Sequence, residues 1–222
     1  MYEKILDAGG NFMINQQLKD NFKKSYDLQA NIRNEKKSPE WKEAERKNFL
    51  SWLKEDEKEA LLDLGAGPGM DSLFFKQNRI NPLAIDISPR MVSLCIQKGI
   101  EAKVMSFDEL QFGERKFDAV WAMNSLLHVP KGDIEEILEK IHALLNKRGL
   151  FYMGVYGGED HEGIWEDDVY EPKRFFSFYS SESIQKLVLN YFTIENFVVL
   201  PPESVDSKFA FQSMILRKKE IV

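Results

Sequence analysis

The fold of this chain is decided by Leu61-Leu62-Asp63-Leu64-Gly65-Ala66-Gly67-Pro68-Gly69-Met70-Asp71-Ser72-Leu73-Phe74-Phe75. An apolar run that carries an aspartate is followed by three glycines at every second position and then by an apolar-rich segment. This pattern predicts a buried strand, a tight turn and the start of a helix. Glycine lets the backbone approach a ligand closely, and the helix N-terminus offers unpaired N–H groups. The stretch therefore predicts a binding turn.

Outward from this turn, apolar strand runs alternate with amphipathic helices, which favours βαβ units and a parallel sheet. Ser88 and Pro89 are expected to start one helix, and Asp133 with Glu136 has the form of a capping box. The last two strands are joined by a link too short for a helical crossover, so we expect them to pair antiparallel. The predicted strands are 60–64, 82–86, 102–105, 117–122, 150–155, 191–200 and 208–216.

Two regions fall outside this alternation. Residues 1–58 are polar and charge-rich, with aromatic side chains at helical spacing after Ser38, the expected N-cap of a helix. We interpret them as an N-terminal helical cap segment on a domain that spans 59–222. Residues 156–179 begin flexible and acidic and continue rich in aromatic side chains, and long connections are more often functional than idle. We interpret this insertion as a lid over a substrate.

Composition restricts the class of protein. Hydrophobic residues make up 43% and charged residues 30% of the 222 residues, which suits a packed α/β domain. The net charge of −6 argues against nucleic acid as a partner, because proteins that grip phosphates present basic surfaces. The single cysteine, Cys95, fits a reducing cytoplasm, and we expect no signal peptide, membrane span or metal site.

The residues around the glycine turn restrict the class of ligand that the turn can bind. A phosphate-binding Walker A loop needs Lys-Ser/Thr after its last glycine, but Met70-Asp71 stands there. The dinucleotide fingerprint is G-x-G-x-x-G, whereas the glycines here alternate singly behind Asp63. A carboxylate at that position disfavours a pyrophosphate and favours a cationic or hydroxyl-bearing ligand.

Several motifs together resemble the class I S-adenosylmethionine (SAM)-dependent methyltransferases. Asp63-Leu64-Gly65-Ala66-Gly67-Pro68-Gly69 is similar to motif I of that family. Asp86 stands at the end of the second strand, where the family holds the ribose hydroxyls. The segment 117–129 is similar to the fourth-strand motif, in which F-D-x-V opens the strand and a histidine follows it. The resemblance covers residues 59 to 217.

The resemblance implies a Rossmann-like, seven-stranded, mostly parallel sheet in the order 3-2-1-4-5-7-6, with strand 7 antiparallel and helices on both faces. It implies S-adenosyl-L-methionine as cofactor and S-adenosyl-L-homocysteine as product. It also implies a set of cofactor-binding residues, namely Asp63, Gly65, Ala66, Gly67, Gly69, Asp86, Ile87, Phe107, Asp108 and Asn124. Of these, Asp108 could instead start a helical turn, and Asn124 could only fix its loop.

The sulfonium methyl group is already activated, so transfer needs mainly an acceptor atom held in line with it. A general base is needed only when the acceptor has a proton to lose. His128 lies near the expected pocket and is the candidate catalytic residue, although a structural role is the alternative. Cys95 is not preceded by proline and is expected in the core.

We expect the acceptor to be a small molecule that lies between the N-terminal segment and the insertion. The candidate substrate contacts are Tyr26, His128, Tyr156, Trp165, Tyr170 and Arg174. Arg174 would meet an acidic substrate group or pair with nearby carboxylates. The alternatives are an RNA or protein methyltransferase, a non-catalytic SAM-binding protein and, more distantly, a dehydrogenase. We expect a monomer or homodimer.

Overall fold

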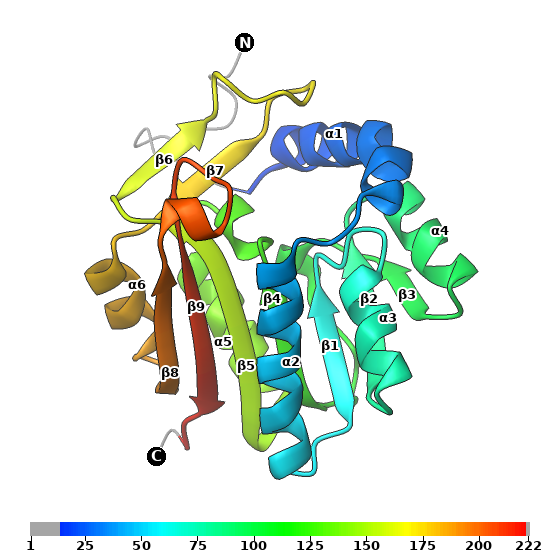
Figure 1. Cartoon of the computed structure of the whole chain (residues 1–222), viewed down its shortest axis with the longest axis vertical. Helices are drawn as coiled ribbons and strands as arrows, with labels where there is room; N and C mark the ends of the chain where they lie inside the picture. Colours follow the sequence, from blue (N-terminus) through cyan, green and yellow to red (C-terminus); the bar gives the residue numbers. More distant parts are fainter. Residues whose placement is uncertain (1–13, 221–222) are drawn as a thin grey trace.

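A seven-stranded sheet in the order β3-β2-β1-β4-β5-β9-β8 forms the centre of the computed structural model, which describes residues 14–220 (Figure 1). The strands β1 to β5 run parallel, and β9 lies antiparallel between β5 and β8. This order confirms the strand order and the antiparallel last strand implied by the resemblance. The strands are β1 (Ala60–Leu64), β2 (Asn81–Asp86), β3 (Glu101–Val104), β4 (Phe117–Met123), β5 (Leu145–Gly157), β8 (Phe192–Leu200) and β9 (Ala210–Lys218).

The register of the sheet places the predicted motifs at one edge. Leu62 of β1 lies opposite Leu83 of β2 and Val120 of β4. The turn after β1, Asp86 at the end of β2 and the residues after β4 therefore meet at the carboxyl edge of the parallel strands. Ligands of open α/β sheets bind at this edge.

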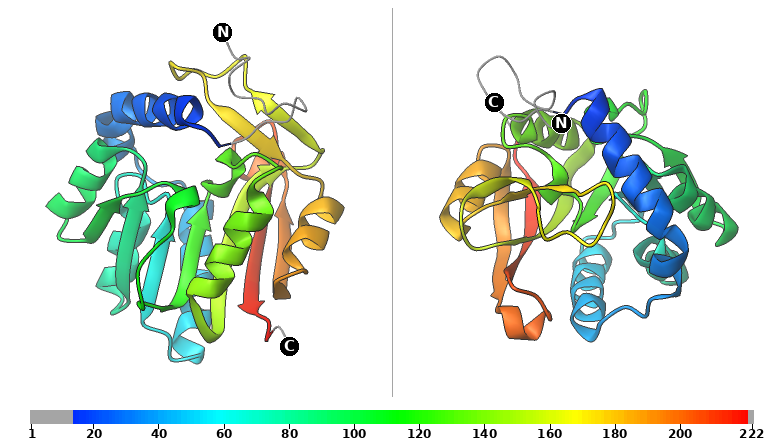
Figure 2. Two further views of the ribbon diagram at one scale, coloured as in Figure 1. Left: turned by 180° about the vertical axis from the view of Figure 1, so that it is seen from behind. Right: turned by 90° about the horizontal axis from the view of Figure 1, so that it is seen from above.

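Helices cover both faces of the sheet and enclose a core on each side (Figures 1 and 2). On one face, Phe49 of α2 and Phe75 of α3 pack on Trp121 and Tyr152, whose rings stack with centroids 3.9 Å apart. On the other face, α5 and α6 bury their apolar stripes against the sheet. The helices of the sheet layers are α2 (Glu40–Glu55), α3 (Met70–Gln77), α4 (Pro89–Gln97), α5 (Ile134–Leu144) and α6 (Ser181–Val188).

Two segments lie over the carboxyl edge of the sheet, and we call them the roof. They are α1 (Gln16–Glu35) and the segment 161–178, whose strands β6 (His161–Ile164) and β7 (Phe175–Phe178) form a separate antiparallel hairpin. Figures 1 and 2 show α1 lying across the strand ends beside this hairpin. Leu18 and Phe22 of α1 pack on Phe175 of β7, so the two halves of the roof share a small core.

The structure thus separates the two helices of the predicted N-terminal segment. Helix α1 belongs to the roof, whereas α2 packs on the sheet and contributes fully buried side chains such as Phe49 and Leu53. Residues 1–13 of that segment lie outside the described residues. The hairpin within 156–179 was not predicted, because its strands are short and are separated by an irregular loop.

Two predicted helix caps are wrong. Helix α2 begins at Glu40 after Pro39, and the Ser38 hydroxyl accepts a hydrogen bond from Arg46 instead of capping the helix. Asp133 precedes α5 without a side-chain cap, because its carboxylate accepts from the backbone N–H of Ile14 at 2.6 Å. The predicted start of α4 at Ser88 is confirmed, since its hydroxyl caps the helix, and Ser180 caps α6 in the same way.

The fifth strand is longer than predicted. It begins directly after α5 at Leu145, and Arg148 takes a positive φ of 56° within it, so Gly149 does not close the helix. Three short 3-10 turns complete the part of the fold that concerns the site and its surroundings. They are η2 (Phe107–Glu109), η3 (Leu126–His128) and η4 (Pro202–Ser204).

Candidate active site

A cavity lies between α1 and the carboxyl edge of β1, β2 and β4. About 730 Å³ of space lies between its lining residues, a volume that includes space open to solvent. Its lining comes from α1, the turn after β1 and the ends of β2, β3 and β4. The lining residues are Ile14, Leu18, Lys19, Phe22, Tyr26, Arg33, Gly65, Gly67, Asp86, Ile87, Met105, Ser106, Phe107, Met123, Asn124, Ser125 and His128.

The glycine turn forms one wall of this cavity. Gly65 and Gly67 line it with φ of 73° and 55°, the left-handed region that favours glycine. A Cβ on Gly65 would lie 2.5 Å from Cβ of Ser125, so only glycine fits there. Gly69 faces away, because a Cβ on it would meet Cys95 Sγ at 2.7 Å. Gly69 therefore packs helix α4 against the turn, and neither it nor Ala66 lines the cavity.

Asp86 anchors the cavity wall at the end of β2. Its two carboxylate oxygens accept from the backbone N–H groups of Gly67 at 2.8 Å and Ser88 at 2.9 Å. Burial raises its pKa, and these two bonds act in the opposite direction. Each oxygen keeps a lone pair, so Asp86 can accept from ligand hydroxyls while it holds the glycine turn. Ile87 adds an apolar surface beside it.

Asp63 lies beneath the turn and does not line the cavity. Its carboxyl is 2% exposed and accepts from the Ser72 hydroxyl at 2.5 Å. Burial raises its pKa to about 8, and the neighbouring Asp71 contributes in the same direction. The group is therefore largely uncharged near neutral pH, so it supports the turn from below and does not present a charge to a ligand.

The third strand is followed by Phe107, which lines the cavity, and by Asp108, which does not. The Asp108 carboxylate accepts from Lys19 of α1 at 3.0 Å, and Glu109 accepts from the same ammonium at 2.8 Å. Asp108 therefore ties α1 to the loop after β3. This is a role that the sequence did not suggest.

The fourth strand ends in two side chains with unpaired polar atoms. Asn124 Oδ1 and Ser125 Oγ are buried and have no hydrogen-bond partner among the described residues. Arg33 of α1 also has a buried, unpartnered Nε and makes no salt bridge within that part of the chain. Buried polar groups are normally paired, so these atoms mark positions where a polar ligand belongs. A ligand with both an ammonium and a carboxylate group would satisfy them.

His128 has both ring nitrogens engaged. Nδ1 lies 2.8 Å from the carbonyl oxygen of Phe175, and Nε2 lies 2.5 Å from the hydroxyl of Tyr26. Burial lowers its pKa to about 3, and the nearby Arg174 contributes in the same direction, so the imidazole is neutral. His128 therefore contacts the predicted substrate residue Tyr26 directly. Both residues line the cavity.

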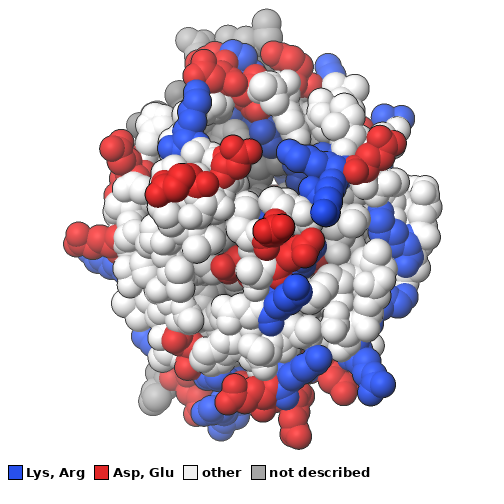
Figure 3. Space-filling view, viewed as in Figure 1, with Lys and Arg blue, Asp and Glu red and all other residues white. Residues whose placement is uncertain are grey.

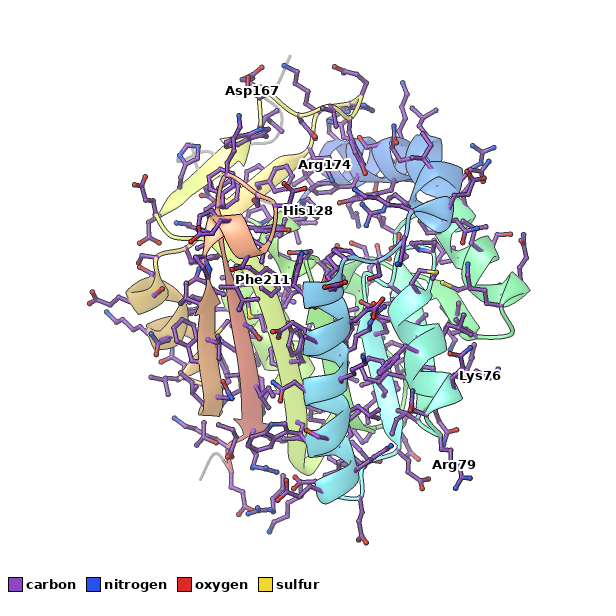
Figure 4. The ribbon with its side chains drawn as sticks, viewed as in Figure 1. Lys76, Arg79, His128, Asp167, Arg174 and Phe211 are labelled. Atoms are coloured by element: carbon purple, nitrogen blue, oxygen red, sulfur yellow. The ribbon has the colours of Figure 1, made fainter. Side chains whose placement is uncertain are left out.

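Above the cavity, Arg174 connects the two halves of the roof (Figure 4). Its guanidinium binds Asp168 through Nε at 2.8 Å and Nη2 at 2.9 Å, and Nη1 donates to the Tyr26 hydroxyl at 3.2 Å. It also lies 3.6 Å from the ring centre of Tyr170, whose hydroxyl accepts from Arg33. Arg174 thus pairs with a nearby carboxylate, one of the two alternatives that the sequence left open.

Four of the six predicted substrate residues do not line this cavity. Tyr170 and Arg174 make the contacts above it that have just been described, and Tyr156 and Trp165 pack elsewhere. Tyr156 packs edge-on against Trp41 and Phe211. Trp165 packs on Phe178 and Phe209 and lines a second, open hollow on the outer side of the hairpin. Six of the predicted cofactor residues line the main cavity, namely Gly65, Gly67, Asp86, Ile87, Phe107 and Asn124.

The sequence did not reveal the inner face of α1. Lys19, Tyr26 and Arg33 recur every seven residues and all line the cavity, with Leu18 and Phe22 beside them. Residues spaced by seven lie on one face of a helix, so this spacing could have indicated that the three side chains face the same site. Figure 3 shows Lys and Arg side chains gathered beside the hollow between α1 and the top of α2, although the net charge of the chain is −6.

Within residues 14–220, no group of three or more His, Cys, Asp or Glu side chains is arranged to hold a metal ion. No helix in the same range is long and apolar enough to cross a membrane.

The solved structures most similar in fold include methyltransferases and a cyclase. The 1,6-didemethyltoxoflavin-N1-methyltransferase of Burkholderia thailandensis, solved with its substrate and S-adenosylhomocysteine, is 21% identical, with a TM-score of 0.62 over 83% of this chain and 92% of its own. DhpI, solved with S-adenosylhomocysteine, is 16% identical, with a TM-score of 0.66 over 90% and 98%. The [4+2]-cyclase SpnF is 16% identical, with a TM-score of 0.59 over 72% and 75%. At these identities the likeness shows a shared fold.

The sequence itself matches a family model described as a methyltransferase domain over residues 61–149. No curated protein matches the chain significantly. The matched residues contain the glycine turn, Asp86 and the fourth-strand motif, which are the elements that build the cavity wall. The motifs, the matched domain and the strand order agree: the chain has the Rossmann-like methyltransferase fold, and its residues 61–149 match a methyltransferase domain.

Proposed function

We propose that this enzyme transfers the methyl group of SAM to a small molecule bound beneath the roof. The observation that carries the proposal is the position of the cavity. It lies between the glycine turn and α1, and the candidate catalytic pair Tyr26 and His128 forms part of the same wall. An acceptor that reaches this pair must fit under a helix and a hairpin, which favours a small molecule over a folded protein or an RNA duplex.

The cofactor would lie along the strand ends in an order set by the chemistry of the wall. Asp86 would accept hydrogen bonds from the ribose hydroxyls, with the adenine between Ile87 and Phe107. The methionine ammonium would meet the unpaired Asn124 Oδ1, and its carboxylate would meet Arg33. This arrangement satisfies buried polar atoms that have no partner among the described residues, which is the support that the structure gives it.

The acceptor must then lie on the side of the methionine part where Tyr26 and His128 are. The protein's main contribution to the rate would be to hold the acceptor in line with the methyl group. The toxoflavin-pathway neighbour acts on a small molecule according to its name, which agrees with this assignment. SpnF is named as a cyclase on the same fold, so binding of SAM alone would not establish methyl transfer.

The test has two stages. Isothermal titration with S-adenosylhomocysteine should show binding, and a homocysteine-coupled turnover assay against a metabolite library should then identify a methylated small molecule. Absence of S-adenosylhomocysteine binding by the folded protein would overturn the assignment. Binding without turnover would indicate a non-catalytic protein, whereas turnover only with RNA or protein acceptors would overturn the small-molecule part.

A further inference from the structure

We propose that Tyr26 is the catalytic base of this enzyme, that it passes the proton of the acceptor to His128, and that the acceptor atom is a hydroxyl oxygen. The proposal rests on the proposed function and names the acceptor chemistry of that site. It gives Tyr26 a catalytic role and makes His128 a residue that acts through Tyr26. The argument begins with the direction of the hydrogen bonds between the two side chains.

The hydrogen-bond partners fix where the protons are. The carbonyl oxygen of Phe175 can only accept, so Nδ1 of His128 carries the hydrogen. In a neutral imidazole Nε2 is then a bare acceptor, and the Tyr26 hydroxyl must donate to it across 2.5 Å. With its own proton committed to His128, the Tyr26 oxygen can offer the cavity only lone pairs. One of them accepts from Arg174 at 3.2 Å, and within residues 14–220 no further hydrogen-bond partner of the Tyr26 oxygen is found, so the other can accept from a ligand.

A free lone pair on the cavity wall selects a ligand that donates a hydrogen bond. An acceptor hydroxyl placed there would point its proton at Tyr26 and its own lone pairs at the methyl group. As the bond from the acceptor oxygen to the methyl carbon forms, the bond from carbon to sulfur breaks. The hydroxyl proton moves to Tyr26, and the Tyr26 proton moves to Nε2 of His128. The products are a methyl ether, S-adenosylhomocysteine and an imidazolium, so atoms and charge balance.

The charges around Tyr26 suit this step. Arg174 donates to the oxygen, and the guanidinium carbons of both Arg174 and Arg33 lie 5.5 Å from the centre of the ring. Burial raises the pKa of Tyr26, and these two positive charges act in the opposite direction, which stabilises negative charge on the tyrosine oxygen. The sulfonium charge disappears as the imidazolium charge forms, so the net charge of the buried site stays constant.

The same surroundings favour a hydroxyl over an amine. Burial and Arg174 hold the pKa of His128 near 3, so this imidazole is a weak base. It cannot take a proton from an ammonium group, and a neutral amine needs no base before it attacks. A hydroxyl oxygen that has gained a methyl group while it keeps its proton is a far stronger acid than an imidazolium. The relay therefore has a function with a hydroxyl acceptor and none with an amine.

The experiment compares Tyr26→Phe with Tyr191→Phe. Tyr191 is also beside a histidine, with its ring centre 6.4 Å from that of His142, but it lies outside the cavity. Hydroxyl acceptors found in the metabolite library should lose ~100-fold or more in kcat with Tyr26→Phe, the usual range for removal of a general base. The S-adenosylhomocysteine affinity should stay within about twofold for both variants, since only an oxygen is removed. Tyr191→Phe should keep the wild-type kcat.

Iodide provides a second readout, because it accepts a methyl group from SAM and has no proton to lose. Tyr26→Phe and His128→Gln should methylate iodide at the wild-type rate, while both lose methylation of hydroxyl acceptors. A merely structural role would lower both reactions together, and that outcome would overturn the proposal. ¹⁵N spectra of the three histidines should show a bare, hydrogen-bonded Nε2 for His128 whose shift changes in Tyr26→Phe.

Three further results would also reject the relay. They are a bare Nδ1 on His128, full hydroxyl methylation by Tyr26→Phe, and a library in which no hydroxyl compound is methylated. Each of these leaves cofactor binding intact, so it would be distinct from failure of the proposed function, in which S-adenosylhomocysteine does not bind.

Discussion

The two walls of the cavity are held in place by contacts between residues with very different separations along the sequence. On the strand side, Asp86 holds Gly67 from 19 residues away along the chain. In the roof, Tyr26 meets His128 across 102 residues and Arg174 across 148. The strand side is therefore set by short motifs whose geometry a turn and a strand end impose. The roof forms only when α1 and the hairpin have both packed on the sheet. The positions of its polar side chains therefore depend on tertiary contacts.

The largest expected effect comes from the glycine turn. Gly65→Ala should lower the free energy of unfolding by about 2–5 kcal/mol, the sum of left-handed strain and overpacking. The added Cβ would clash with Ser125, so S-adenosylhomocysteine binding should be lost as well. Gly113→Ala is the matched control. The φ of Gly113 is 61°, and an added Cβ would have no atom within 4 Å, so this variant introduces backbone strain without a steric clash. Chemical denaturation measures the free energy of unfolding of both variants. Equal decreases in the two variants would show that the added Cβ at Gly65 does not clash with Ser125.

Asp86→Asn should weaken S-adenosylhomocysteine binding by about 2–3 kcal/mol, on the order of 100-fold, because hydrogen bonds to a charged acceptor are lost. Calorimetry measures the effect. Asp118→Asn is the control, since Asp118 accepts from the backbone of Ala60 at the opposite edge of the sheet. An equal loss in both variants would show that the effect is general destabilisation and not loss of a cofactor contact.

Arg33→Gln tests the proposed contact between the roof and the carboxylate of the cofactor. We expect about tenfold weaker binding of S-adenosylhomocysteine, because one charge-assisted contact to its carboxylate is lost. Methylthioadenosine lacks that carboxylate, so its affinity should not change. Arg79→Gln removes an exposed arginine far from the cavity (Figure 4) and should affect neither ligand. If both ligands weaken equally with Arg33→Gln, the carboxylate assignment is wrong.

The smallest effect concerns pH. The pKa of His128 is about 3 in the folded protein against 6.5 ordinarily, so the unfolded chain gains a proton first as the pH falls. Stability is therefore retained above pH 6.5 and is lost as the pH falls toward 3, by up to about 1.4 kcal/mol per pH unit. Between pH 6.5 and 5.5 we expect a loss of about 1 kcal/mol that His128→Gln lacks. Urea denaturation of the wild type and of His128→Gln at both pH values measures this difference. An equal loss of stability in the two proteins would contradict the prediction.

Much of the strand side could be predicted from sequence. The turn and the parallel strands follow from local patterns, whereas the strand order was implied by the resemblance to the methyltransferase family. Four members of the predicted cofactor set, Asp63, Ala66, Gly69 and Asp108, do not line the cavity. Asp63 points under the turn to Ser72, and Asp108 is taken by Lys19 from 89 residues away. Neither partner can be identified from the motif that contains the aspartate.

The roof was less predictable for the same reason. Ser38 and Asp133 have the local form of helix caps, but Arg46 and the Ile14 backbone occupy their oxygens. Trp165 is aromatic and lies near the expected site in sequence, yet the hairpin turns it to the outer hollow. Arg33 belongs to none of the sequence motifs, so its position at the cavity was not predicted. Such side chains acquire their roles from whichever distant segment packs against them, and one sequence does not specify that segment.

Helix α1 forms part of the cavity wall and is held at the sheet by contacts to the loops after β2 and β3 and to the hairpin. Any molecule that fills the cavity is therefore a ligand of α1 as much as of the strands. By thermodynamic linkage, the free energy by which the docked helix tightens binding equals the free energy by which the bound molecule stabilises docking. A cofactor bound in this cavity would therefore stabilise the docked roof, and binding and docking of α1 would form one coupled equilibrium.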